Sequence, residues 1–297
     1  MCDNKVRHIM GLNIIGLGGK NMLVSREELQ EKLKVIQASE FKVPETMSAF
    51  EITSIMLEYL GDSDPELRDD LIYGTLSNWI MNGAFNKEQL KQILVAVLDD
   101  KHLFYKIGEM DTNSVFMRAF SVLIVASIVY VHREDSFLDY EELKSVKNKI
   151  VKYMEEEKDV RGYVVEGGWA HTAAHSSDTL DELCLCKELG RVELLEILNA
   201  IKHKVSIEYH AYTCYEDERL AFATNSLIGR NLLTEEEISK WVKSFAEYDK
   251  NIDFPNHYYL ITNIRNYLNS LYYRLPKDEY KVIREAISDT ILLIRRY

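Results

Sequence analysis

The stretch TNSVFMRAFSVLIVASIVYVH, residues 112–132, decides the fold together with DYEELKSVKNKIVKYMEEE, residues 139–157. The first segment is apolar on all sides, which is typical of a buried helix. In the second segment, apolar residues recur at spacings of three and four, which predicts an amphipathic helix. Because only a short link separates the two segments, we expect them to pack as an antiparallel pair.

The same helical pattern repeats from Ser25 to the end of the chain. Ser25 and Glu28 form a capping box, and Pro65 suits the first turn of a helix. The only strand-like stretches are short, and we expect them to be loops or extended connections, at 163–168 and 205–215. The further helices are predicted at 25–37, 45–61, 64–83, 86–100, 191–204, 215–229, 234–248, 257–275 and 277–297.

This organisation predicts an all-α protein built from stacked antiparallel helix pairs, a HEAT-like α-α superhelix. The prediction rests on helix and link lengths, because no repeat is visible in the sequence itself. A compact helical toroid or bundle is the alternative. No linker rich in Pro, Gly or Ser interrupts residues 25–297, so we expect a single domain there, preceded by a flexible leader at 1–24.

Composition narrows the classes of partner. The formal charge of −12 makes broad nucleic-acid binding unfavourable. The most apolar run, 115–131, contains Arg118 and is shorter than the roughly 20 residues of a membrane span, which indicates a core helix and no membrane span. The four cysteines contain no CxxC pair, which favours reduced thiols and a cytoplasmic location.

One stretch carries chemistry at helical spacing, GGWAHTAAHSSDTLDEL at 167–183. We expect a helix from about Trp169 to Lys187, in which His171, His175 and Asp178 fall within about 60° of one another. Trp169 falls on the opposite, apolar side, and we therefore expect its side chain to be buried.

Two histidines four residues apart can bind one metal ion, and Asp178 would add a carboxylate suited to zinc, iron or manganese. The stretch lacks the glutamate of an HExxH motif, so the general base of a zinc protease is missing. A single helix also encloses a metal poorly. A further ligand would have to come from elsewhere, with Asp111, Glu216 and Glu218 as candidates.

Other interpretations of this polar stripe remain open. The histidines could bond carbonyls or carboxylates of a neighbouring helix, the stripe could be solvated, or it could contact a ligand without metal. Polar residues also interrupt apolar helices at Arg68, Asp69 and Arg118. Because buried polar groups need partners, we expect these residues to converge with the stripe on a binding cleft or a structural network.

The segment RGYVVEGGWAHTAAHSSDTLDEL resembles the hallmark of a bacterial family catalogued as a domain of unknown function, with the pattern RGxVxxxGWAHxxAHxxDxLxxL. The resemblance extends to blocks at 64–80, 113–125, 216–221 and 266–275. It implies an all-helical fold and supplies no reaction. The residues that fit the pattern are Arg161, Gly162, Gly168, Trp169, Ala170, His171, Ala174, His175, Asp178 and Leu180.

Two functions follow as hypotheses. The first is a helical-repeat protein that binds a protein, peptide or small ligand in a groove lined by the HxxxHxxD helix, with Arg118, Arg68 and Asp69 nearby. The second is a metal-dependent hydrolase centred on His171, His175 and Asp178. A metal assay on protein without a histidine tag would separate them.

Overall fold

The computed structural model describes residues 24–294, and the leader predicted at 1–24 therefore lies almost entirely outside the described residues. The protein is all-α, with one two-stranded antiparallel hairpin in the described part. Its elements are α2 (Arg26–Ala38), α3 (Ala49–Glu58), the π-helix η1 (Glu66–Tyr73), α4 (Gly74–Met81), α5 (Lys87–Val97), α6 (Ser114–Glu134), α7 (Tyr140–Glu156), β1 (Tyr163–Val164), β2 (Gly168–Trp169), α8 (Thr172–Leu185), α9 (Arg191–Val205), α10 (Glu216–Gly229), α11 (Glu235–Lys243), the 3-10 helix η2 (Ser244–Ala246), α12 (Asn256–Arg274) and α13 (Lys281–Ile294).

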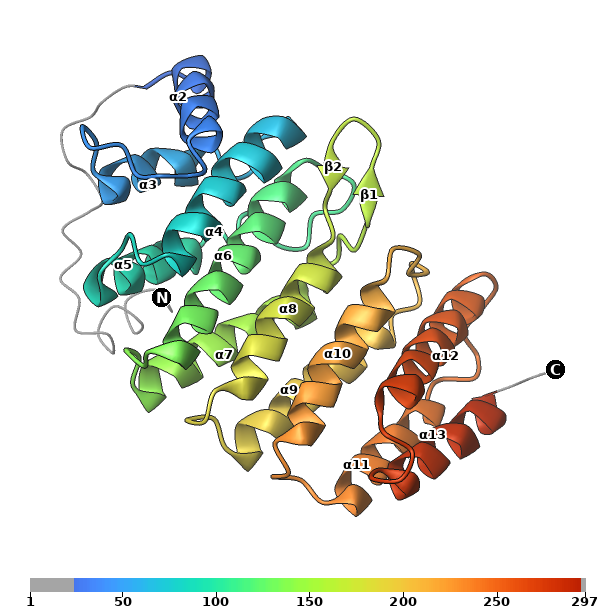
Figure 1. The fold of residues 1–297 in the computed structure, drawn as a ribbon. Coiled ribbons are helices and arrows are strands. Elements are labelled where there is room, and N and C mark those ends of the chain that lie inside the picture. The colour runs from blue at the N-terminus through green and yellow to red at the C-terminus, as the bar shows by residue number, and fades with distance from the viewer. Residues whose placement is uncertain (1–23, 295–297) are drawn as a thin grey trace.

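The helices are arranged in two layers. Figure 1 shows α4, α6, α8, α10 and α12 side by side, and each packs directly against the next. Behind this layer, α7 packs against α9 and α11 packs against α13. Consecutive helices such as α7 and α8, or α12 and α13, connect the layers. The predicted all-α class and the packing of helices in pairs are thus confirmed. The pair expected from 112–132 and 139–157 is not formed closely, because α6 packs mainly against α4, α5 and α8, and α7 packs mainly against α9 and α8.

Local sequence signals fix where several helices begin. Complete capping boxes start α2, α5, α7 and α11, in which a side-chain oxygen accepts from the third helical N–H and the third residue bonds back to the cap. Each box satisfies backbone donors that would otherwise have no partner. The caps are Ser25, Asn86, Asp139 and Thr234.

Helix α6 forms the centre of the core. It is long and apolar enough to cross a membrane by composition alone, but 72% of its most apolar window is buried inside the protein. Helices α4, α5 and α8 cover it. The burial explains why every side of this helix is apolar, as the sequence predicted for a core helix.

Gly61 marks a close approach between the link after α3 and α6. A Cβ atom at this position would lie 2.6 Å from Met117 Cβ and 2.8 Å from Met117 Cα. Because part of the obstacle is backbone, the contact cannot be relieved by turning a side chain. Gly229, the last residue of α10, has no atom within 4 Å of the corresponding position.

We predict that Gly61→Ala lowers the free energy of unfolding by about 1–3 kcal/mol, because it overpacks the contact with α6. Gly229→Ala serves as the matched control and should be neutral or stabilising by up to about 1 kcal/mol, since alanine favours the helix. Urea denaturation of both variants measures the difference. Equal stabilities of the two variants would contradict the close approach.

Candidate functional site

The hairpin before α8 positions the histidines. Tyr163 pairs with Trp169 across its two strands, and Gly168 adopts φ +77°. A side chain on Gly168 would meet Pro65 Cβ at 2.9 Å, so glycine allows the hairpin to lie against the start of η1. Helix α8 consequently begins at Thr172, later than the sequence predicted.

Trp169 is 43% exposed, and the expectation that it belongs to the core is wrong. It belongs to β2 and not to the helix, so helical periodicity does not place its side chain. The indole instead stacks on the His171 ring, with centroids 4.7 Å apart, and meets Tyr163 edge to face at 5.1 Å.

His171 caps α8 in a left-handed conformation, with φ 50°. Its Nε2 lies 2.8 Å from the carbonyl oxygen of Cys214 and 3.5 Å from Glu216 Oε1. A carbonyl oxygen only accepts, so Nε2 carries the proton, and Nδ1 of the neutral ring carries the lone pair. The contact also brings the start of α10 beside the start of α8.

His175 lies one turn further along α8 and is 8% exposed. Its Nδ1 is buried without a hydrogen-bond partner among the described residues. Burial, the main cause, lowers the pKa of His175 to about 3, although the backbone of Ala119 beside the ring favours the protonated form. The ring is therefore neutral at neutral pH.

Both carboxylate oxygens of Asp178 accept hydrogen bonds from the same residue, Arg219. Arg219 Nη1 of α10 lies 2.5 Å and 2.6 Å from the two carboxylate oxygens. Burial nevertheless raises the pKa of Asp178 above its ordinary value. Because this carboxylate is paired with an arginine, the structure does not assemble the predicted metal set of His171, His175 and Asp178 among residues 24–294.

Arg68 and Asp69 hold the hairpin to η1. Arg68 is fully buried, and its Nη2 donates to the Gly167 carbonyl at 2.7 Å while Nη1 donates to the Asp62 carbonyl at 2.8 Å. Its Nε lies 2.7 Å from Asp69 Oδ1, and its Cζ lies 4.0 Å from the centroid of Phe116. Burial raises the pKa of Asp69 to about 6.

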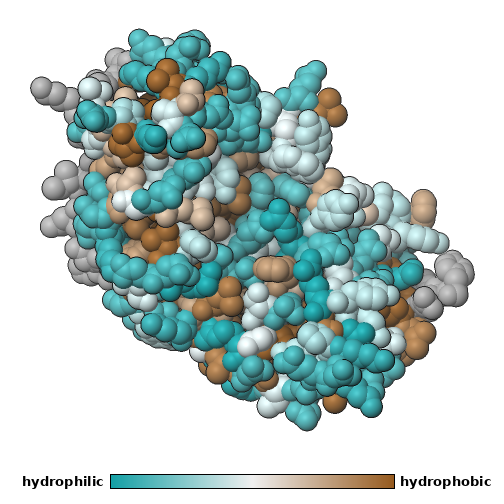
Figure 2. Space-filling model, viewed as in Figure 1, coloured by the Kyte–Doolittle hydropathy of each residue, from teal (hydrophilic) through white to brown (hydrophobic). Residues whose placement is uncertain are grey.

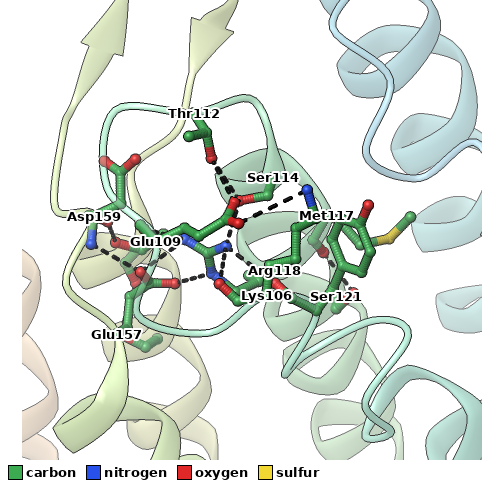
Figure 3. Close-up of polar contacts among 12 residues, drawn as sticks. Lys106, Glu109, Thr112, Ser114, Met117, Arg118, Ser121, Glu157 and Asp159 are labelled. Atoms are coloured by element: carbon green, nitrogen blue, oxygen red, sulfur yellow. Dashed lines mark hydrogen bonds and ion pairs between the residues drawn. The ribbon is translucent and has the colours of Figure 1, made fainter.

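Arg118 serves a separate network (Figure 3). Its Nε and Nη2 donate to the Glu157 carboxylate at 2.5 Å and 2.9 Å. The remaining donors reach Ser114 Oγ and the carbonyls of Tyr105 and Glu109. Every nitrogen of this guanidinium is therefore occupied by the protein, and Arg118 stabilises the fold without facing the histidines.

The predicted site residues thus divide into two neighbourhoods. In the first neighbourhood, Phe120 of α6 lies between Arg68 and His175, since its ring centroid is 4.8 Å from Arg68 Cζ and 5.7 Å from the centroid of the His175 ring. His171 belongs to the same neighbourhood, because its ring centroid lies 5.5 Å from that of His175. Arg118 forms the second neighbourhood with Glu157.

The sequence did not place the partners from α10. Glu216 was a candidate ligand without a position, and the structure puts its carboxylate beside His171. The side chain is 1% exposed; Oε2 accepts from the Cys214 amide at 2.8 Å, and Oε1 has no hydrogen-bond partner. Arg219 gave no signal, because its pairing with Asp178 spans 41 positions of the chain.

A different group meets the spacing of a metal site, formed by His132, Cys186 and Glu188. His132 Nδ1 accepts the amides of Phe137 and Leu138, both at 3.1 Å, so its proton resides on Nε2. Cys186 Sγ donates to the Glu182 carbonyl at 3.3 Å, and His132 Nε2 lies 3.6 Å from Glu188 Oε1. Burial also raises the pKa of the Cys186 thiol to about 12. In this arrangement the group forms a protonated, structural cluster.

Residues 103–273, more than half of the chain, match a family model described as protein of unknown function, DUF2785. The chain belongs to this family. The DUF2785 region contains both histidines, Arg118 and Arg219, whereas Arg68 and Asp69 precede it. Searches of curated proteins and of solved structures each gave no match.

Lys204 extends the Arg118 network of this DUF2785 protein towards α9. Its Nζ donates to the Glu157 carbonyl at 2.7 Å, and the side chain is almost completely buried. Burial lowers the pKa of Lys204 to about 7. An amine whose pKa is lower in the folded chain than in the unfolded chain makes stability rise with pH between the two values.

We predict that Arg118→Met lowers the free energy of unfolding by about 3–5 kcal/mol, because it leaves the Glu157 carboxylate buried without its cation. Arg191, which pairs with Glu237 at the surface and has a 54% exposed side chain, offers the matched control. Arg191→Met should cost less than about 1 kcal/mol. Urea denaturation compares them, and similar losses would show that the Arg118 pair does not support the fold.

We also predict that the free energy of unfolding depends on pH through Lys204, and that the variant Lys204→Met loses this dependence. Between pH 7 and 9 the unfolded chain keeps the Lys204 proton that the folded chain has lost, so the wild type should gain about 2 kcal/mol relative to the variant. Thermal and urea unfolding at several pH values measure this difference. Parallel pH profiles of the two proteins would contradict the buried amine.

Proposed function

We propose that this protein is a helical-repeat binding protein of the cytoplasm whose ligand occupies the neighbouring ends of α8 and α10. The site consists of His171, His175 and the exposed face of Trp169, with Glu216 behind His171. The ligand is small, and the two histidines bind it as electron-pair donors through Nδ1.

One observation carries this proposal. His175 Nδ1 is a buried nitrogen without a hydrogen-bond partner among residues 24–294, beside a second imidazole whose Nε2 already donates to a carbonyl. A buried polar atom without a partner costs about 1–3 kcal/mol, which a bound ligand would recover. The buried polar groups of the Arg118 network are paired, by contrast, as expected for a scaffold.

The surroundings support a site that is open at one side. Trp169 and Tyr163 are exposed next to the histidines, and aromatic faces supply contact area at low entropic cost. Figure 2 shows hydrophilic residues interspersed with apolar ones over α8 and α10, without one continuous apolar surface. A small ligand with polar groups fits this environment better than an extended apolar one.

The metal-dependent hydrolase centred on His171, His175 and Asp178 receives less support. Its carboxylate is held by both oxygens to Arg219, and freeing it would leave that arginine without its partner. Hydrolysis would also need a general base, and no carboxylate bonds to a free nitrogen of either histidine among the described residues. Binding is therefore the function that the geometry favours.

Fluorine NMR of 5-fluorotryptophan-labelled, EDTA-treated protein tests the proposal. Of the three tryptophans, Trp79 and Trp241 are buried, so Trp169 alone reports on the site. We expect small amines, amides and alcohols with N–H or O–H donors to shift the Trp169 resonance selectively. The variant His175→Phe keeps an aromatic ring but lacks the acceptor, and it should weaken this binding at least tenfold, equivalent to about 1.4 kcal/mol.

The matched control is His210→Phe, because His210 lies outside the site and contacts Tyr212 instead. It should leave the shifts unchanged, and Trp169→Phe assigns the resonance. If neither these compounds nor an added divalent metal ion shifts the Trp169 signal, or if His175→Phe binds as tightly as the wild type, the proposed site is refuted.

A further inference from the structure

We infer that the ligand held by His171 and His175 is a single divalent transition-metal ion, bound by the Nδ1 atoms of both rings with its other coordination positions open. This inference rests on the proposed binding site and names its occupant. It differs from the set expected from the sequence, because Asp178 remains paired with Arg219.

Accessibility favours an ion over an organic group. His175 Nδ1 has almost no exposed surface, so a bulky donor group would have to displace neighbouring side chains. A metal ion is one atom and binds imidazole nitrogen at about 2.0–2.1 Å. Ring centroids 5.5 Å apart are compatible with two imidazoles that converge on one such ion.

The hydrogen bond behind the His171 ring matches those of metal-binding histidines. Such histidines donate their second ring N–H to a carbonyl or carboxylate, which fixes the tautomer and the ring direction. His171 Nε2 donates to the Cys214 carbonyl at 2.8 Å, and Glu216 Oε1 lies 3.5 Å from the same nitrogen without accepting a hydrogen bond from it. His175 Nδ1 is buried without a hydrogen-bond partner among the described residues. The His171 bond to Cys214 thus leaves Nδ1 of that ring for a metal ion, and Nδ1 of His175 is not held by any described protein group.

The donor set also indicates which ions fit. Two imidazole nitrogens without a carboxylate suit zinc, copper or nickel better than manganese or magnesium. Arg219 and Arg68 both repel positive charge at His175, but Arg219 is paired with Asp178 and Arg68 with Asp69, which reduces the repulsion of a cation. Two protein ligands leave room for water or for a donor atom of a second molecule, as in open metal sites.

The test uses the full chain without a histidine tag, stripped with EDTA and titrated with Co²⁺ by visible absorption and with Zn²⁺ by calorimetry. We expect one ion per chain and no thiolate charge-transfer band. His171→Phe and His175→Phe should each weaken binding at least tenfold. Cys186→Ser should bind like the wild type, because Cys186 belongs to the alternative cluster with His132. His210→Phe should also bind like the wild type, because His210 lies outside both clusters.

A second measurement avoids substitution of the buried His175. Side-chain ¹⁵N spectra of the wild type should show that Zn²⁺ shifts both Nδ1 resonances. The inference is overturned if metal binding is not saturable at millimolar concentrations, if it persists in the double histidine variant, or if Cys186→Ser abolishes it. Binding of organic donors at Trp169 without metal binding would also overturn it, while leaving the proposed binding function intact.

Discussion

The buried ion pair between Arg118 and Glu157 is the interaction on which the arrangement of the candidate site depends. Arg118 belongs to α6, and Glu157 follows α7 directly, so the pair joins the core helix to the segment that leads into the hairpin. The Glu157 carboxylate also accepts the Asp159 amide at 2.8 Å, and the Asp159 carbonyl accepts Thr172 Oγ1 at 2.5 Å. Thr172 is the first residue of α8, so this chain of bonds sets where His171 and His175 lie.

The candidate site differs from the Arg118 network in having two unsatisfied polar atoms close together, although single unsatisfied atoms such as His132 Nε2 and Asp181 Oδ1 also occur elsewhere among the described residues. Arg118 has a protein partner at every nitrogen, and the two amides at His132 Nδ1 fix that ring as a structural group. The acceptors His175 Nδ1 and Glu216 Oε1 lack hydrogen-bond partners and lie close to the same imidazole, His171. One bound electron-pair acceptor at His171 and His175 would explain why both of these atoms lack a partner within the described part of the chain.

Helical periodicity was sufficient to predict the all-α class and the burial of α6, because both depend on spacing along the chain. It also placed His171 and His175 on neighbouring turns. It failed at Trp169, because the hairpin between Tyr163 and Trp169 delays the start of α8 and a strand residue does not follow a helical face. The partners Glu216 and Arg219 come from α10, and periodicity carries no information about contacts between distant helices.

Long-range ¹H–¹⁵N spectra of the histidine side chains in metal-free protein at neutral pH test the central claim most directly. The account predicts a proton on His171 Nε2, which lies 2.8 Å from the Cys214 carbonyl, and a neutral His175 ring whose buried Nδ1 is unprotonated. Lowering the pH should leave His175 neutral until well below pH 5, since burial lowers its pKa to about 3. A proton on Nδ1 of either ring, or a cationic His175 at neutral pH, would contradict the account.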